Sequence, residues 1–355
     1  MPSVAHLLLA VAVLPALVAA QSANTEAEQR GVKQSKGAAA LFLILYLSAT
    51  LVQWTHYFRN KHKPRAYMLN LTIGMLCMSL GFLIRITGNY AWQFLLTFLS
   101  PCAFYAADYT ILKHLARAVG PEVSSACLFM PARAIVWVFL LSDVVTFCAQ
   151  TAGTVMTIIG GDLLSIGEKI AIAGLILQLI SFSLFSILLI VFARRLSRNY
   201  PSVWRGKDAG GNFLRCWRTQ PVDDVRLMVR ILGLTCIGLI IRAIFRTVEQ
   251  ADGFFGYIAT TEIFFYLFDA TPLWLSMALF VFVWPTRYVA GAEEGAAAKE
   301  MGGSSWRQGG VVEMGPFADP QLIGPRKITR AEREREQQRR WEREQQQRGG
   351  RQQRY

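Results

Sequence analysis

Residues 168–195, EKIAIAGLILQLISFSLFSILLIVFARR, decide the fold of this chain. Between Lys169 and Arg194 the stretch contains no charged residue, and it is longer than the roughly 20 residues that a helix needs to cross a bilayer. The stretch lacks the alternation of a strand, and an unpaired backbone group in lipid is too costly for an open structure. The sequence therefore predicts a membrane-spanning helix that ends in a basic loop.

Six other apolar runs of comparable length are separated by shorter polar segments. Together the runs predict an all-α integral membrane protein, a seven-transmembrane helix bundle. The predicted spans are Gly37–Phe58, Ala66–Ile86, Trp92–Leu112, Ala134–Ala152, Glu168–Phe192, Leu227–Arg246 and Thr261–Trp284.

Basic residues are distributed unevenly between the loops that join these spans. Thr87–Ala91, Gly153–Gly167 and Thr247–Thr260 contain no Lys or Arg, whereas the alternate loops are rich in both. Basic residues resist translocation, so the loops that keep them stay in the cytoplasm. We therefore expect an exoplasmic N-terminus and a cytoplasmic C-terminus. The basic residues that fix this orientation are Arg59, Lys61, Lys63, Arg65, Lys113, Arg117, Arg133, Arg194, Arg195, Arg198, Arg205, Lys207, Arg215, Arg218 and Arg226.

The two ends of the chain differ in composition from the spans. Residues 1–20 are expected to be a cleaved signal peptide, because an apolar stretch ends in small residues suited to cleavage before Gln21. Residues 21–36 would then be an exoplasmic segment ahead of the seven-helix domain at 37–286. Residues 287–355 are expected to be cytoplasmic, a Gly-rich linker (Ala292–Pro325) and an Arg/Glu/Gln-rich tail that is disordered or a solvated helix. The tail could bind a cytoplasmic partner.

The net charge of +13 has a plain explanation in this topology. The basic residues lie mostly in cytoplasmic loops and the tail, where they are expected to attract anionic lipid rather than nucleic acid. His56, His62 and His114 all lie near cytoplasmic span ends, and no Cys/His pair has zinc spacing. We therefore expect no metal, no cofactor and no enzymatic activity.

Four ionisable residues lie well inside predicted spans, namely Asp108, Asp143, Arg242 and Asp269. A charge that faces lipid near the bilayer centre costs on the order of 3 kcal/mol, so these side chains are expected to face the bundle interior. Arg242 and Asp269 lie at similar depth in consecutive spans, which predicts a salt bridge between them.

Further polar residues crowd the exoplasmic half of the bundle. With Arg85, these residues sum to a formal charge of −1, which slightly favours a cationic headgroup. One interpretation is an interhelical network that only holds the helices together. The other is a partly hydrated cavity for the headgroup of an amphiphile. The candidate binding residues are Asp143, Gln150, Gln178, Arg242, Arg246, Glu249, Glu262 and Asp269.

Other classes of seven-span protein lack their signatures in this chain. Thr261–Trp284 has no lysine for a retinal Schiff base, and too few histidines remain for a zinc-dependent hydrolase. The chain has no Asp-Arg-Tyr after the third span and no Asn-Pro-x-x-Tyr in the seventh, which argues against a rhodopsin-type receptor.

Polar and small residues instead form ordered blocks along the spans. The blocks are Gly81–Arg85, Pro101–Tyr109, Asp143–Gly153, Gly174–Gln178, Arg242–Gly253 and Glu262–Pro272. In this order they resemble the fungal lipid-translocating exporter family, also called RTA-like proteins, over about residues 37–286. The chain departs from that family at Met78, where an acid is usual, and at His114, where an arginine is usual.

The resemblance implies translocation or export of lipid-like amphiphiles, such as sphingoid long-chain bases or toxic amphiphilic compounds, at the plasma membrane. Membrane lipids or amphiphilic small molecules would then be its partners. An alternative is a seven-helix sensor that binds an amphiphile and signals through the basic third cytoplasmic loop and the tail. The alternative is favoured by the absence of an internal repeat, because transporters usually have one.

The loop charges make a direct prediction about topology. Protease added to intact cells should leave a tag placed after Tyr355 uncut, and should cut it after the cells are permeabilised. Cleavage of the tag in intact cells would contradict the predicted orientation.

Overall fold

The computed structural model describes residues 35–60, 66–87, 90–159, 163–207, 220–253 and 256–308, and within these ranges the regular structure is entirely helical. The predicted signal peptide, most of the exoplasmic segment and the tail from residue 309 lie outside the described residues. The longer helices are α2 (Lys36–Arg59), α3 (Leu69–Thr87), α4 (Tyr90–Ala118), α6 (Ala132–Ile159), α7 (Leu163–Asn199), α9 (Val225–Ala251), α12 (Thr271–Phe282) and α13 (Pro285–Gln308). The shorter elements are η1 (Ala66–Met68), α5 (Pro121–Cys127), α8 (Pro201–Arg205), α10 (Tyr257–Thr260), α11 (Glu262–Phe264) and η2 (Phe265–Ala270).

Six helical segments of the described chain are long and apolar enough to cross a membrane. Five of the six contain a predicted span and Glu262–Phe282 lies within the predicted span Thr261–Trp284, so the third predicted span is the one not represented among them. The third, Trp92–Leu112, lies in α4, whose 29 residues correspond to a length of about 43 Å. The six segments are Lys36–Arg59, Ala66–Thr87, Ala132–Thr157, Leu163–Asn199, Val225–Ala251 and Glu262–Phe282.

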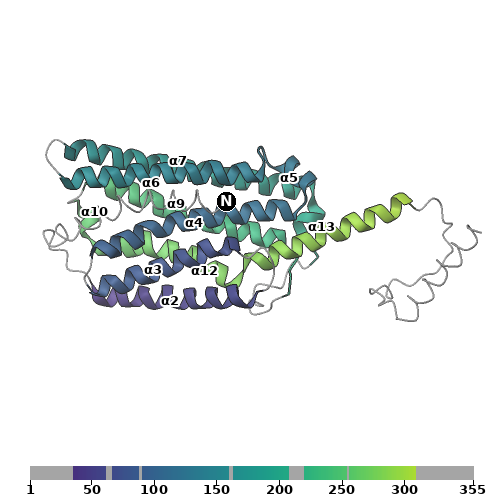
Figure 1. The fold of residues 1–355 in the computed structure, drawn as a ribbon, viewed down its shortest axis with the longest axis horizontal. Coiled ribbons are helices and arrows are strands. Elements are labelled where there is room, and N and C mark those ends of the chain that lie inside the picture. Colours follow the sequence, from purple (N-terminus) through teal and green to yellow (C-terminus); the bar gives the residue numbers. More distant parts are fainter. Residues whose placement is uncertain are drawn as a thin grey trace, which may run out of the picture. The chain divides into compact units, whose positions relative to one another are not determined.

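The long helices from α2 to α12 lie side by side, with α10 at one end and α5 at the other (Figure 1). In α2 polar side chains are buried and apolar side chains are exposed, which is the reverse of a helix in a water-soluble protein. Its buried face includes Thr50, Gln53 and His56, while Leu41 and Ile44 are more than half exposed. An apolar outer face with polar side chains inside is the arrangement expected where the surrounding solvent is lipid.

Three hydrogen bonds from side chains to backbone carbonyls join α2 to the last apolar segment. The Tyr46 hydroxyl donates to the Ala270 carbonyl at 2.8 Å, and the Gln53 side-chain amide donates to the Met277 carbonyl at 2.9 Å. The Trp274 indole N–H returns a bond to the Leu45 carbonyl at 2.9 Å. Residue numbers rise together along both segments, so α2 and α12 run parallel.

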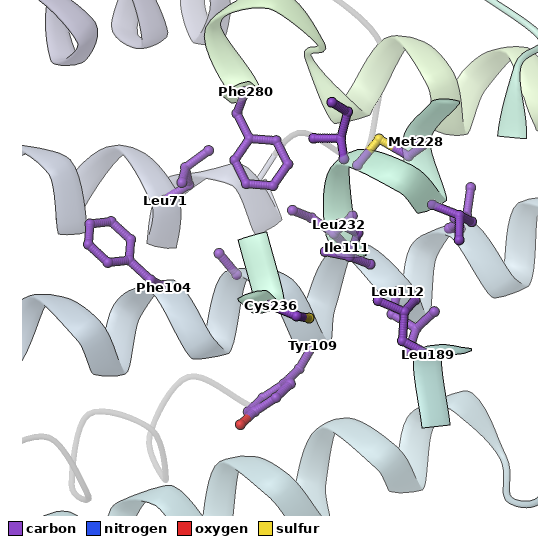
Figure 2. Packing of buried hydrophobic residues seen from close by; sticks show 14 of the residues in the cluster. Leu71, Phe104, Tyr109, Ile111, Leu112, Leu189, Met228, Leu232, Cys236 and Phe280 are labelled. Carbon is purple, nitrogen blue, oxygen red and sulfur yellow. The ribbon is translucent and has the colours of Figure 1, made fainter. Parts of the chain in front are cut away.

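Helix α4 occupies the centre of the bundle, where it packs against α3, α6 and α9. Figure 2 shows Phe104, Ile111 and Leu112 of α4 among apolar side chains from the surrounding helices, while the oxygen of Tyr109 points away from them. A helix enclosed by others does not need a lipid-facing surface. This allows α4 to carry buried polar residues such as Ser100 and Asp108.

Glycine allows a close helix contact between α6 and α7. A Cβ atom on Gly153 would lie 2.5 Å from the Ala171 nitrogen, and one on Gly167 would lie 2.6 Å from the Gly153 carbonyl oxygen. Small residues that let backbones approach are the usual packing device between helices in lipid. Both glycines belong to the predicted loop Gly153–Gly167. That segment is mostly helix, because α6 continues to Ile159 and α7 begins at Leu163.

The last apolar segment contains a π-helical turn, η2, directly before α12. Pro272 has no N–H to donate to the carbonyl four residues earlier, and a π turn is one of the usual responses to such a break. The Thr271 hydroxyl bonds the Tyr266 carbonyl at 2.7 Å and so satisfies one of the wider turn's acceptors.

The chain after the last apolar segment differs from the predicted linker. Helix α13 continues through Gln308, so the first part of Ala292–Pro325 is helical. The start of α13 is fixed to the segment before α9, because Val222 N–H bonds the Arg287 carbonyl and the Arg287 guanidinium bonds the Gln220 carbonyl. Gly291 meets Val222 so closely that a Cβ atom would lie 2.2 Å from the Val222 carbonyl. Glycine is used there for contact rather than for flexibility.

The α6–α7 contact predicts a selective effect of one methyl group. Gly153→Ala should destabilise the protein in detergent by about 1–3 kcal/mol, because the new methyl meets backbone atoms that cannot rotate away. Gly233→Ala in α9 is the matched control, since nothing lies within 4 Å of its Cβ position. Thermal unfolding of the two variants should separate them, and equal midpoints would contradict the close contact.

Candidate functional site

Asp269 is the centre of a network of charges inside the bundle. Its carboxylate is completely buried and accepts from the guanidinium groups of both Arg242 and Arg246, one on each oxygen. Arg242 also reaches the Thr97 carbonyl of α4 at 3.5 Å, and Arg246 pairs with Glu249 one turn further along α9 at 3.0 Å. The predicted salt bridge between Arg242 and Asp269 is confirmed, and Arg246 is a second partner.

A further ion pair lies close by and joins three segments of the chain. Arg85 of α3 donates to Glu262 of α11 at 2.8 Å, and the second oxygen of Glu262 accepts the backbone N–H of Ser35 at 2.8 Å. The guanidinium groups of Arg85 and Arg246 lie 4.9 and 5.6 Å from the centre of the Phe265 ring. An arginine over an aromatic face is stabilised by the ring quadrupole. The ring thus connects the two groups of ion pairs.

We refer to these six residues as the outer ion-pair network; they are Arg85, Arg242, Arg246, Glu249, Glu262 and Asp269. Three arginines face three carboxylates, so its formal charge is zero. The predicted formal charge of −1 does not apply to this network, because that value included Asp143, which bonds Tyr109 instead. Exposure rises outward through the network, from 0% for the side chain of Asp269 to 17% for Glu262 and 26% for Arg246.

Asp143 lies in a different contact, between α4 and α6. Its Oδ2 accepts the Tyr109 hydroxyl at 2.7 Å, while its Oδ1 has no hydrogen-bond partner among the described residues. The carboxyl is 3% exposed. No ion pair within the described ranges includes it.

Gln150 and Gln178 form a third contact, between α6 and α7. The Gln150 side-chain amide donates to the Gln178 side-chain carbonyl at 2.7 Å, and both residues are buried. Gly174 gives Gln150 its space, because a Cβ atom there would lie 2.9 Å from the Gln150 side chain. The structure therefore brings five of the eight candidate residues into one network. The other three lie in contacts made by α6, where Asp143 and Gln150 belong to α6 itself and Gln178 reaches it from α7.

Sequence reasoning missed two partners in the interior. The sequence does not indicate a partner for Arg85, because Met78 stands where the family usually has an acid and Glu262 is 177 residues away in the chain. Asp108 was expected to face inward, but its partner, the Thr235 hydroxyl at 3.0 Å, could not be chosen from the sequence. Both pairings depend on which helices become neighbours.

Within the described ranges no group of three His, Cys, Asp or Glu side chains is arranged to hold a metal ion.

Charged pairs inside a bundle of apolar helices define the class of this protein, which is an all-α, multi-pass membrane protein. Its residues 71–292 match the family described as RTA1 like protein. The chain belongs to this fungal RTA-like family.

Three relatives from Saccharomyces cerevisiae are similar to the chain. Protein RTM1 is 28% identical over 193 residues, 54% of this chain and 56% of that protein. Protein RTA1 is 27% identical over 197 residues, 55% of this chain and 56% of its own length. Protoporphyrin uptake protein 1 is 28% identical over 195 residues, 55% of this chain and 58% of its own length. The chain thus spans little more than half the length of these relatives, and no solved structure matches it.

The shared carboxylate predicts a non-additive mutant pair. Asp269→Ala leaves Arg242 buried without a carboxylate and should destabilise the protein by about 3–5 kcal/mol. The double variant with Arg242→Ala removes the stranded charge and should recover part of that loss, because Arg246 keeps Glu249. Glu294→Ala, at an exposed position of α13, is the control. Equal losses of folded protein in the single and double variants would show that Arg242 and Asp269 do not stabilise each other.

Proposed function

We propose that this protein is a plasma-membrane translocator of lipid-like amphiphiles, among which sphingoid long-chain bases fit best, and not an enzyme. The outer ion-pair network is the observation that carries the proposal. Ionisable residues among membrane-spanning helices are expensive and commonly belong to substrate pathways. The family also contains a relative named for uptake of an amphiphilic molecule, protoporphyrin.

The network offers complementary groups to an amino-alcohol headgroup. Arg85 Nε, Arg242 Nη1 and Arg246 Nε are buried N–H groups without a partner among the described residues, so they can donate to hydroxyl oxygens. The carboxylates of Glu249 and Glu262 are partly exposed and can accept an ammonium group. A balanced network can thus take a headgroup that both donates and accepts, while the alkyl chain lies along the apolar outer surface of the helices.

We infer that α4 is the seventh span. The parallel direction of α2 and α12 supports this, because α3, α4, α6, α7 and α9 lie between them in the chain. Five intervening crossings leave the first and last spans parallel, whereas four would make them antiparallel.

The loop charges support the remaining features of the proposed topology. We place the N-terminus outside after removal of a signal peptide at residues 1–20, and the C-terminus in the cytoplasm. The outer ion-pair network then lies toward the exoplasmic side. The basic cytoplasmic loops would contact anionic lipid, and the tail could bind a cytoplasmic partner.

Release of a labelled sphingoid base tests the proposal, both from cells and from vesicles that contain only the purified protein. Glu262→Gln keeps the volume and an acceptor oxygen for Ser35 but removes the charge that faces Arg85. Release and resistance to a toxic long-chain amine should fall several-fold in this variant at unchanged surface level, and Glu294→Gln should behave as wild type.

One outcome would contradict the role of the network, and another would contradict translocation. If Glu249→Gln combined with Glu262→Gln leaves release unchanged, the network only holds the helices together. If the purified wild-type protein moves no label in vesicles although its presence changes release from cells, the protein is a sensor that acts through its cytoplasmic loop and tail.

A further inference from the structure

Two carboxyl groups in the bundle centre lie apart from every arginine pair of the described structure. Asp108 is completely buried and Asp143 is 3% exposed. Each has one oxygen near a hydroxyl group and one oxygen without a partner among the described residues. An ionised carboxylate in such surroundings would be an uncompensated charge at membrane depth, which proteins avoid by keeping the proton.

The proton count around Asp108 agrees with a neutral acid. The Thr235 hydroxyl lies 2.8 Å from the Leu232 carbonyl and 3.0 Å from Asp108 Oδ2, yet it has one proton to donate. If Asp108 carries a proton on Oδ2, it donates to Thr235 and Thr235 donates to Leu232. Both contacts are then satisfied. If Asp108 lost this proton, the Thr235 hydroxyl could donate to only one of the two oxygens, so the neutral acid satisfies one contact more than the carboxylate does.

Asp143 is arranged differently, because the Tyr109 hydroxyl donates to its Oδ2 and its proton must then lie on Oδ1. That O–H group has no acceptor among the described residues. A carboxyl with a permanent donor on one oxygen and a free position on the other can exist in both the protonated and the ionised state. When a water molecule removes the proton from Oδ1, the Tyr109 hydroxyl remains to stabilise the carboxylate on Oδ2.

A buried polar stripe along α6 leads from Asp143 toward the Gly153 end of that helix. Its members recur at intervals of three, four or seven residues and so share one face. The Gln150–Gln178 pair continues the stripe onto α7. The stripe comprises Asp143, Thr146, Gln150, Gly153 and Thr157.

The ionisable groups that face the two carboxyls come from several elements. Arg242 is the cation among them, and it is already held by Asp269. The others are tyrosines, thiols and the Asp269 carboxylate, which is itself paired with arginine, so none of them compensates a charge on Asp143. The facing groups are Cys102, Tyr105 and Tyr109 of α4, Cys148 of α6, Cys236 and Arg242 of α9, and Asp269 of η2.

We propose that Asp143 is the proton-exchange site of this protein, reached along the polar stripe of α6, and that its protonation couples amphiphile movement to the proton gradient. Asp108 stays neutral and supports the packing of α4 on α9. The coupling rests on the proposed translocation, whereas proton exchange at Asp143 does not. In the coupled step one proton passes between Asp143 Oδ1 and water on one side of the membrane and is returned to water on the other.

The coupling is tested with purified protein in vesicles, by measuring accumulation of a labelled sphingoid base across imposed pH gradients. With one proton moved for each substrate, one unit of gradient changes the accumulation ratio about tenfold in the wild type. Asp143→Asn should still equilibrate the label but should lose this response, and Glu294→Gln should keep it. A variant Asp143→Asn that follows the gradient as the wild type does would overturn the coupling.

Infrared spectra test proton exchange even if no transport is found. The wild type should show the carbonyl stretch of a protonated carboxyl that disappears as pH rises, and Asp143→Asn should lack this titrating band. If that variant does not fold, Tyr109→Phe should shift the band, because the carboxyl loses the one hydrogen bond that it makes within the described part of the chain. A band that is absent from the wild type, or that neither substitution alters, would overturn the assignment.

Discussion

The carboxylate of Asp269 is the interaction on which the arrangement of the last two apolar segments depends. It carries one charge, is completely buried, and is shared by two arginines of α9. Removing any of the three would leave a charge that neither lipid nor the apolar core can solvate. The π turn of η2 contains Asp269 and precedes Pro272, so the break that proline imposes lies where the carboxylate meets α9. Local backbone geometry and the ion pairs therefore determine the same contact.

From that contact the interior divides into two regions with different electrostatics. Around Asp269 the charges are paired, balanced and increasingly exposed toward Glu262 and Arg246. Among the described residues, neither Asp108 nor Asp143 is paired with a cation, and hydroxyl groups supply their hydrogen bonds. Under the proposed function, a headgroup exchanges with partners in the first region, because its charged groups can replace those of the network. In the second region the proposed exchange is that of a proton on Asp143.

Much of this organisation was predictable because lipid imposes simple rules on a sequence. Apolar length identified the six segments that are long and apolar enough to cross a membrane, and similar depth paired Arg242 with Asp269. What could not be predicted depends on lateral packing. Arg85 meets Glu262 because α3 lies beside α11, and the glycines of the predicted loop Gly153–Gly167 lie inside helices that approach closely. Likewise, the close contact between Gly291 and Val222 cannot be inferred from a composition that is typical of a linker.

Helix α4 connects the two regions physically. Its Thr97 carbonyl accepts from Arg242, and about 18 Å further along the same helix Asp108 and Tyr109 bond Thr235 of α9 and Asp143 of α6. Consecutive residues on a helix point in directions about 100° apart, which is why neighbours in sequence serve two different helices. Any displacement of α4 along α9 would alter the Arg242 contact and the Asp108 contact together. In the proposed mechanism, a headgroup that rearranges the outer ion-pair network can therefore affect the surroundings of Asp143 through one helix, without a continuous chain of polar groups between them.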